Sequence, residues 1–230
     1  MVEKFLIVPK IILIMIGSSG LRVKLISYSM IVEKKTDDMK DPDRIVAESG
    51  AISHSKEFKN LNKEKVEHLI KLLRDLGHES VFEHVSFTFS IEGISRVCSH
   101  QLVRHRMASF TQQSQRYVPL DPEFIIPETI YNSEFKDEYL KLIDNAKNLY
   151  KKMVESGIRK EDARFILPQS VETKIIMTMN GRELRHFINL RASKEAQWEI
   201  RALALEILKI VYDVSPILFE DLYKKFIENK

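Results

Sequence analysis

The stretch that decides the fold is Val85–Arg106, which has the sequence VSFTFSIEGISRVCSHQLVRHR. Its first six residues alternate strictly between apolar and polar side chains, which is typical of a half-buried β-strand. We expect Gly93 to end this strand. The residues that follow, Ile94–Arg106, suit a helix that carries a basic triplet at its C-terminal end, where cations complement the helix dipole.

On either side of this stretch the chain is mainly helical. Asn62 and Asn180 each precede an amphipathic pattern, so each is expected to cap a helix. Strands are expected at Val23–Ser29 and Val171–Met179. Further helices are expected at 133–156, 160–167, 196–211 and from 215 onward. We therefore predict an α+β fold, a helix-rich single domain with a small, mostly antiparallel sheet.

The longest expected helix spans residues 133–156. The residues expected to face inward share a helical spacing and are Phe135, Tyr139, Leu142, Ala146, Leu149 and Met153. Two other segments, Asp37–Asp43 and Tyr117–Tyr131, are expected to be loops, because the first is charged and the second contains three prolines.

The composition is that of an ordinary globular chain. Of the 230 residues, 44% are hydrophobic and 30% are charged, and the formal net charge is only +3. A protein that coats nucleic acid usually has a larger or more clustered positive excess, so we expect no nucleic-acid partner. The single cysteine, Cys98, excludes an intramolecular disulfide, and we expect it to be a buried packing residue of a cytoplasmic protein.

The N-terminal region is strongly apolar over Phe5–Gly17. This run is interrupted by Pro9 and Lys10 and is shorter than the roughly 20 residues that span a bilayer, so we expect no membrane association. A disordered extension, a start codon placed too early and an extra packing strand remain open. We expect residues 1–22 to be a non-essential extension and residues 23–230 to form the domain.

Cationic residues gather in the sequence around the end of the helix predicted after Gly93. Gln101 and Arg104 share a face of that helix, and Ser114 and Arg116 follow a short polar stretch. Guanidinium groups bind phosphate bidentately and hydroxyl groups add donors, so the cluster indicates a site for a phosphorylated ligand. A solvated basic helix end remains the alternative.

The wider pattern of motifs is more specific than this cluster. Arg104-His105-Arg106 is separated by seven residues from Ser114. Further blocks occur in the order His78-Glu79-Ser80, Glu161–Pro168, Asn180-Gly181-Arg182, Phe187–Arg191 and Ala196–Ile200. The order and spacing of these blocks resemble the flavin-dependent thymidylate synthases over residues 23–228.

The resemblance implies an FAD-dependent methyltransferase that converts deoxyuridine monophosphate (dUMP) to thymidine monophosphate (dTMP). Methylenetetrahydrofolate would supply the one-carbon unit, and NADPH would reduce the bound FAD. The resemblance also implies a homotetramer whose active sites are shared between subunits. No G-x-G-x-x-G motif follows a strand, so a Rossmann cofactor domain is not expected.

The resemblance also assigns ligand contacts position by position. The positions that match FAD contacts are His78, Ser80, Arg104, His105, Arg106, Met107, Gln112, Asn180, Arg182 and His186. The positions that match nucleotide contacts are Gln101, Leu102, Val103, Arg104, Gln112, Gln113, Ser114, Gln115, Arg116, Arg164 and Arg191. Two residues depart from the family pattern: Gln112 stands where many members have Glu, and His186 stands where others often have Asn.

Arg191 is the expected catalytic residue. Hydride attack on the uracil ring places negative charge on the ring oxygens and the third nitrogen, and a cation at that edge stabilises this charge. Ser114 is expected to bind the substrate. A covalent nucleophile is the alternative, because His105 lies nine residues away in the sequence and could act as its base.

The competing hypothesis is a non-catalytic nucleotide- or RNA-binding protein that uses the basic patch Arg104–Arg116. This hypothesis predicts a steep salt dependence of polynucleotide binding, and the near-neutral net charge argues against it. No metal site is expected, because His78 and His84 lack the H-E-x-x-H spacing.

Overall fold

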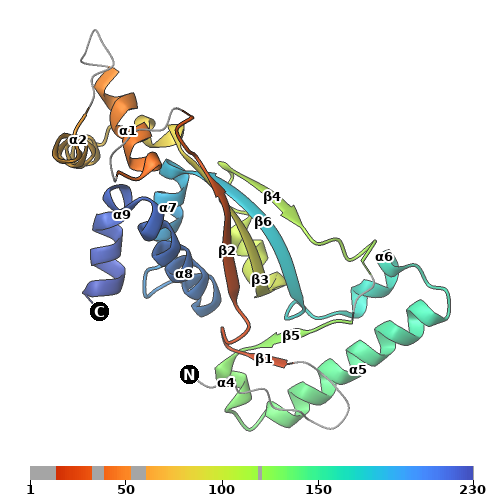
Figure 1. The fold of residues 1–230 in the computed structure, drawn as a ribbon. Coiled ribbons are helices and arrows are strands. Elements are labelled where there is room, and N and C mark those ends of the chain that lie inside the picture. Colours follow the sequence, from red (N-terminus) through yellow and green to blue (C-terminus); the bar gives the residue numbers. More distant parts are fainter. Residues whose placement is uncertain (1–13, 33–38, 53–60, 119–120, 230) are drawn as a thin grey trace. The chain divides into compact units, whose positions relative to one another are not determined.

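The computed structural model describes residues 14–32, 39–52, 61–118 and 121–229, and this part of the chain contains two sheets. The smaller sheet pairs β1 (Ile14–Ile16) in parallel with β5 (Phe124–Ile126). The larger sheet is antiparallel, in the order β2 (Arg22–Tyr28), β3 (Ser86–Ser95), β6 (Glu172–Asn180), β4 (Ala108–Gln112). Figure 1 shows these four strands side by side. The three predicted strands are confirmed, whereas β4 and β5 were not predicted and β1 was only one of the open interpretations of the N-terminal region.

Helices account for most of the remaining described chain, which confirms the helix-rich α+β class. They are α1 (Asp41–Ile52), α2 (Lys63–Asp75), η1 (Glu79–His84), α3 (Arg96–Leu102), α4 (Glu128–Tyr131), α5 (Lys136–Glu155), α6 (Lys160–Ala163), η2 (Arg164–Ile166), α7 (Gly181–Arg191), α8 (Trp198–Val214), α9 (Pro216–Tyr223) and the π-helical turn η3 (Lys224–Glu228). The side chains of Asn62 and Asn180 accept hydrogen bonds from the N–H groups of Lys65 and Glu183, so both predicted caps are confirmed.

The strand and the helix predicted from Val85–Arg106 have different limits from those expected. Strand β3 continues through Gly93, whose φ of 72° favours glycine. A Cβ atom on Gly93 would lie 1.9 Å from the carbonyl oxygen of Gly20, so this glycine permits a close approach of two backbones and does not end the strand. Helix α3 then ends at Leu102, so the basic triplet lies beyond the helix.

The two predicted loops are also wrong in part. Residues 41–43 belong to α1, whereas 37 and 38 lie outside the described residues. Tyr117–Tyr131 contains β5 and α4. Pro122 precedes β5 and Pro127 is the N-cap of α4, so these prolines lie at the boundaries of short elements and do not exclude them.

The described chain divides into two compact units. Unit 1 comprises residues 14–22, 91–104, 111–118 and 121–176, and unit 2 comprises residues 23–32, 39–52, 61–90, 105–110 and 177–229. Residues 14–16 form β1, as the packing-strand interpretation of the N-terminal region proposed. The dispensability of residues 1–22 and the single-domain boundary at residue 23 stay predictions.

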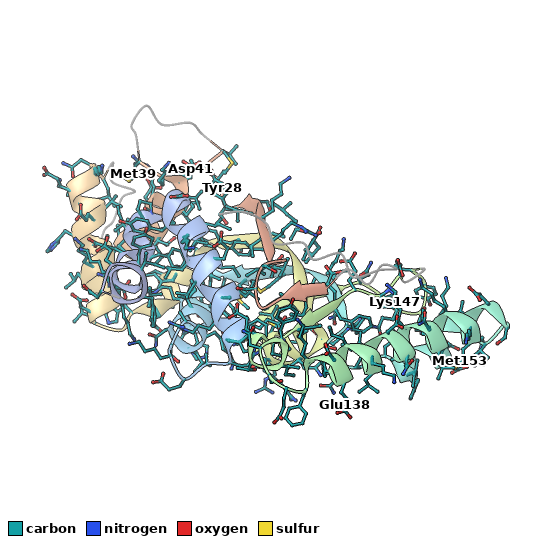
Figure 2. The ribbon with its side chains drawn as sticks, turned by 90° about the horizontal axis from the view of Figure 1, so that it is seen from below. Tyr28, Met39, Asp41, Glu138, Lys147 and Met153 are labelled. Atoms are coloured by element: carbon teal, nitrogen blue, oxygen red, sulfur yellow. The ribbon has the colours of Figure 1, made fainter. Side chains whose placement is uncertain are left out.

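The buried face of helix α5 in unit 1 agrees with the predicted one only in part: Ala146 is buried and Tyr139 packs against the buried cluster, as predicted. Its buried residues are Ile143, Ala146, Lys147 and Tyr150, whereas Phe135, Leu142 and Leu149 are exposed. The reason is that α5 carries apolar residues on two faces, and only the face of Ile143 meets the cluster of Phe124, Ile126 and Val171. Figure 2 shows Lys147 and Glu138 pointing to opposite sides of α5, and the buried Lys147 pairs with Asp121 at 3.0 Å.

In unit 2, a buried carboxylate organises the start of α9. Asp43 accepts hydrogen bonds from the Ser215 hydroxyl at 2.7 Å and from the N–H groups of Ile217 and Leu218 at 3.1 and 3.0 Å. These contacts satisfy backbone donors that a helix N-terminus leaves open. No helix in the described ranges is long and apolar enough to cross a membrane.

Candidate functional site

A cavity of about 520 Å³ lies in unit 2 between η1, α7 and α9. Its walls include four of the positions that the sequence assigned to FAD: Met107, Asn180, Arg182 and His186. The other lining residues are Glu79, Glu83, Glu183, Arg185, Asn189, Asp221 and Leu222. The cavity therefore brings together residues that are far apart in the sequence, from Glu79 to Leu222.

Both arginines of this cavity are already paired with carboxylates. Arg182 lies 2.7 Å from Glu83 and 3.4 Å from Glu79. The largely buried Arg185 forms a two-pronged ion pair with Asp221, with distances of 2.8 and 2.7 Å, and also donates to the carbonyl oxygen of Leu218. The cavity therefore offers donors and acceptors without a net excess of positive charge.

His105 lies buried next to this cavity, with both ring nitrogens engaged. Its Nδ1 atom is 2.9 Å from Oε1 of Glu183, and its Nε2 atom is 3.1 Å from Nε of Arg191. The ring of Phe187 meets the imidazole edge to face, at 5.1 Å between centroids. Burial lowers the pKa of His105 and outweighs the opposite effect of the Glu183 carboxylate, so the imidazole is neutral at pH 7.

Unit 1 gathers arginines around helix α6. The Nε and Nη2 atoms of Arg116 both lie 2.9 Å from Oε2 of Glu161, and Nε of Arg164 donates to the Glu161 carbonyl oxygen at 3.1 Å. Burial lowers the pKa of Arg96, and the nearby positive charge of Arg164 lowers it further. No carboxylate of the described chain lies within ion-pair distance of Arg96 or Arg164.

The other predicted nucleotide positions of unit 1 lie on α3, on β4 and in the segments that follow them. Leu102 is buried at the end of α3, and Arg104 is exposed just beyond it. The amide of Gln112 donates to the Thr173 hydroxyl at 3.1 Å, and the Ser114 hydroxyl accepts from the N–H of Arg116 at 3.2 Å. The remaining members are Gln101 and Gln115, both half-buried, Val103, which is exposed, and Gln113, which hydrogen-bonds through its backbone to Lys174.

Besides His105, three predicted FAD positions of unit 2 do not line the cavity. His78 and Ser80 are exposed at the start of η1, and Arg106 is exposed in the segment before β4. Within the described ranges, no group of three or more His, Cys, Asp or Glu side chains is placed to hold a metal ion.

The sequence analysis did not single out Arg96 and Glu183, although both adjoin predicted site residues. A signal for Arg96 existed: it is a cation in the first turn of α3, where the helix dipole disfavours positive charge. Glu183 could not be distinguished from an ordinary acidic residue in the first turn of α7, because its contact with His105 joins residues 78 positions apart.

Comparison with known proteins gives a family match over most of the chain. The family described as thymidylate synthase complementing protein matches residues 35–217. The flavin-dependent thymidylate synthase of Pyrococcus furiosus is 50% identical over 170 residues, which are 70% of each chain. The proteins of the same name from Thermococcus onnurineus and Thermococcus kodakarensis are 44% and 48% identical, over 82% and 83% of this chain and 78% of each relative.

Proposed function

This chain belongs to the thymidylate synthase complementing protein family, and from that membership we propose that it is a flavin-dependent thymidylate synthase. It converts dUMP to dTMP, with methylenetetrahydrofolate as the carbon donor and with FAD and NADPH as the reducing system. The family match over residues 35–217 carries this conclusion. The alternative of a non-catalytic nucleotide- or RNA-binding protein is not favoured.

The cavity of unit 2 suits the uncharged adenosine end of FAD. Because Arg182 and Arg185 are paired with carboxylates, the cavity lacks the free positive charge that a pyrophosphate needs. It does offer amide, guanidinium and carboxylate groups that can hydrogen-bond a base and a ribose, and Asn180 and His186 lie on its wall. The exposed His78, Ser80, Arg104 and Arg106 and the half-buried Gln112 are proposed to reach other parts of the cofactor.

The residues of unit 1 are proposed to bind dUMP. Of Arg96, Arg116 and Arg164, only Arg116 pairs with a carboxylate, that of Glu161, so the group favours a phosphate. Ser114 adds a hydroxyl donor, and its role as a substrate binder stays the favoured one over a covalent nucleophile. Gln101–Arg104 and Gln112–Gln115 are proposed to contact the rest of the nucleotide.

FAD, once bound and reduced, supplies the hydride. Arg191 is proposed to act on the pyrimidine: its guanidinium stabilises the negative charge that develops on the ring oxygens and the third nitrogen. The neutral His105 holds Nε of Arg191 and thereby orients the guanidinium plane. We further propose that the protein is a cytoplasmic homotetramer that shares its active sites between subunits and binds no nucleic acid.

The purified protein tests this function directly. We expect a yellow protein whose flavin absorbance is bleached by NADPH in the absence of oxygen. Addition of dUMP and methylenetetrahydrofolate should then restore the absorbance and yield dTMP. A colourless protein that neither takes up FAD nor forms dTMP would contradict the proposal, and steeply salt-dependent binding of oligonucleotides would support the rival function instead.

A further inference from the structure

The two contacts of His105 determine which of its ring nitrogens carries the proton. The Nε atom of Arg191 has a hydrogen and no lone pair, so it can only donate to Nε2 of His105, 3.1 Å away. A neutral imidazole that accepts at Nε2 carries its proton on Nδ1. That proton points to Oε1 of Glu183 at 2.9 Å, and a carboxylate is the acceptor that this tautomer needs.

The rest of Arg191 is left available for a ligand. In the described part of the chain, no hydrogen bond or ion pair engages its two Nη atoms, and the side chain is half-buried. One edge of the guanidinium is therefore held by an imidazole while the opposite fork is open.

We propose that Glu183 is a positioning residue for Arg191: it fixes the Nδ1–H tautomer of His105, and this tautomer holds the guanidinium in the orientation that acts on the pyrimidine. The role of Arg191 in this inference rests on the proposed function. The geometry of the chain Glu183–His105–Arg191 does not, because its three members contact one another within unit 2 without any ligand.

The opposite tautomer would not support the same arrangement. An Nε2–H group would face the Nε–H group of Arg191 at 3.1 Å, and Nδ1 would present a lone pair to a carboxylate. The other groups that face the ring are His186 and Phe187, and neither one replaces the acceptor that Glu183 provides. The backbone of Glu183 is fixed at the start of α7, because its N–H donates to the side chain of Asn180 at 2.9 Å.

The first test compares Glu183→Ala, Glu183→Gln and the control Glu206→Gln. Glutamine keeps an acceptor for Nδ1–H, whereas alanine removes it. We expect Glu183→Ala to lower kcat about 10- to 100-fold, the range for partners that orient a functional histidine, while the dUMP dissociation constant changes less. Glu183→Gln should restore most of kcat. Glu206 pairs with Lys209 on the exposed face of α8, so its variant should match the wild type.

The second test reads the tautomer without any turnover. Proteins labelled with ¹⁵N-histidine give distinct nitrogen resonances for the two tautomers, and the signal that His105→Gln removes identifies His105. We expect the Nδ1–H form at pH 7.5 in the wild type and in Glu183→Gln, and a mixture in Glu183→Ala.

Each outcome decides between the two proposals. An Nε2–H tautomer in the wild type, or full activity in a folded Glu183→Ala, would overturn the positioning role. If Glu183→Ala does not fold, inactive but folded Glu183→Gln with the tautomer unchanged would overturn it as well. A wild type that shows the Nδ1–H tautomer but forms no dTMP would refute the function and leave the fixed tautomer standing.

Discussion

The two units of the molecule surround their arginines with different partners. In unit 2, Arg182 and Arg185 each lie against a carboxylate of the cavity wall. In unit 1, the single carboxylate of Glu161 serves Arg116 and also Arg159, at 2.8 Å, while its backbone carbonyl accepts from Arg164. The arginines that line the cavity of unit 2 are therefore balanced by carboxylates, whereas those around α6 in unit 1 outnumber the carboxylates that contact them.

This difference indicates which part of a ligand each unit can hold. A concentration of guanidinium groups with few carboxylates favours a phosphate, because the anion relieves the repulsion among the cations. Paired guanidiniums favour neutral groups, since binding a second anion would require the first pair to separate. Arg191 differs from Arg182 and Arg185: its partner His105 is neutral, so its charge stays uncompensated by that contact.

The largest expected effect comes from this difference. Arg191→Ala should lower kcat by about 100- to 1000-fold, the usual cost of removing one group that stabilises developing negative charge. The bound FAD should remain, as measured by the absorbance of the purified variant. Arg201→Ala, which removes a cation from the same unit together with its 3.4 Å hydrogen bond to the carbonyl oxygen of Ala192, is the matched control. Loss of flavin together with activity would place Arg191 in cofactor binding instead.

The phosphate preference of unit 1 predicts the next largest effect. Arg164→Ala should raise the dUMP dissociation constant about 10- to 100-fold, because a hydrogen bond to a charged group contributes about 1.5–3 kcal/mol. Binding of deoxyuridine, which lacks the phosphate, should change far less; calorimetry with both ligands measures the difference. Arg22→Ala, whose side chain pairs with Glu92 at 3.0 Å, controls for loss of charge. Equal losses for the two ligands would contradict a phosphate contact.

The balanced pairs of unit 2 predict an effect on stability. Asp221→Ala should lower the free energy of unfolding by about 2 kcal/mol, less than for a fully buried pair because Asp221 is partly exposed. Urea unfolding of the ligand-free protein measures this. Asp75→Ala removes an exposed carboxylate 3.9 Å from Arg74 and is the control.

The same variant has an expected pH dependence. Burial alone would raise the pKa of Asp221, but the hydrogen bond from Arg185 and the charges of Arg185 and Arg74 outweigh it and lower the pKa. The carboxylate therefore stabilises the folded state above its unfolded pKa of about 3.9, and this contribution is lost as the pH falls through the lowered pKa. The difference in the free energy of unfolding between wild type and Asp221→Ala should therefore decrease as the pH is lowered. A difference that does not change with pH would mean that the ion pair does not cause it.

The smallest expected effect is that of Ser114→Ala. A neutral hydroxyl that only binds the substrate contributes about 0.5–1.5 kcal/mol, so the variant should keep activity within about 2- to 10-fold of the wild type. Steady-state rates of dTMP formation measure this. An inactive variant that still binds dUMP would instead support a covalent role for Ser114.

The sequence predicted those parts of the molecule that local chemistry determines. The Asn62 and Asn180 caps follow from side-chain geometry over three residues, and the strand at 85–90 follows from its alternation. The buried face of α5 was predicted only in part, because two apolar faces compete and the choice between them depends on Phe124 and Val171, which are distant in the sequence.

For the candidate site, motif spacing identified Met107, Asn180, Arg182 and His186, which share one cavity. It did not identify Arg96, whose position in the first turn of α3 was the available signal, and it could not identify Glu183, because the contact of Glu183 with His105 forms only when the chain folds. A motif search therefore misses residues whose role depends on a contact with a residue far away in the sequence.

Strand β1 lies before the residues that the family model matches, but it pairs with β5, which lies within them. All three residues of β5 are buried, and β5 meets β1 on one side and a bridge from Phe124 to Val171 on the other. A truncated protein that starts at residue 23 would lack β1. One edge of β5 would then expose unpaired backbone N–H and C=O groups beside apolar side chains. An exposed strand edge can pair with a strand of another molecule, so the truncated protein would tend to self-associate and precipitate as its concentration rises.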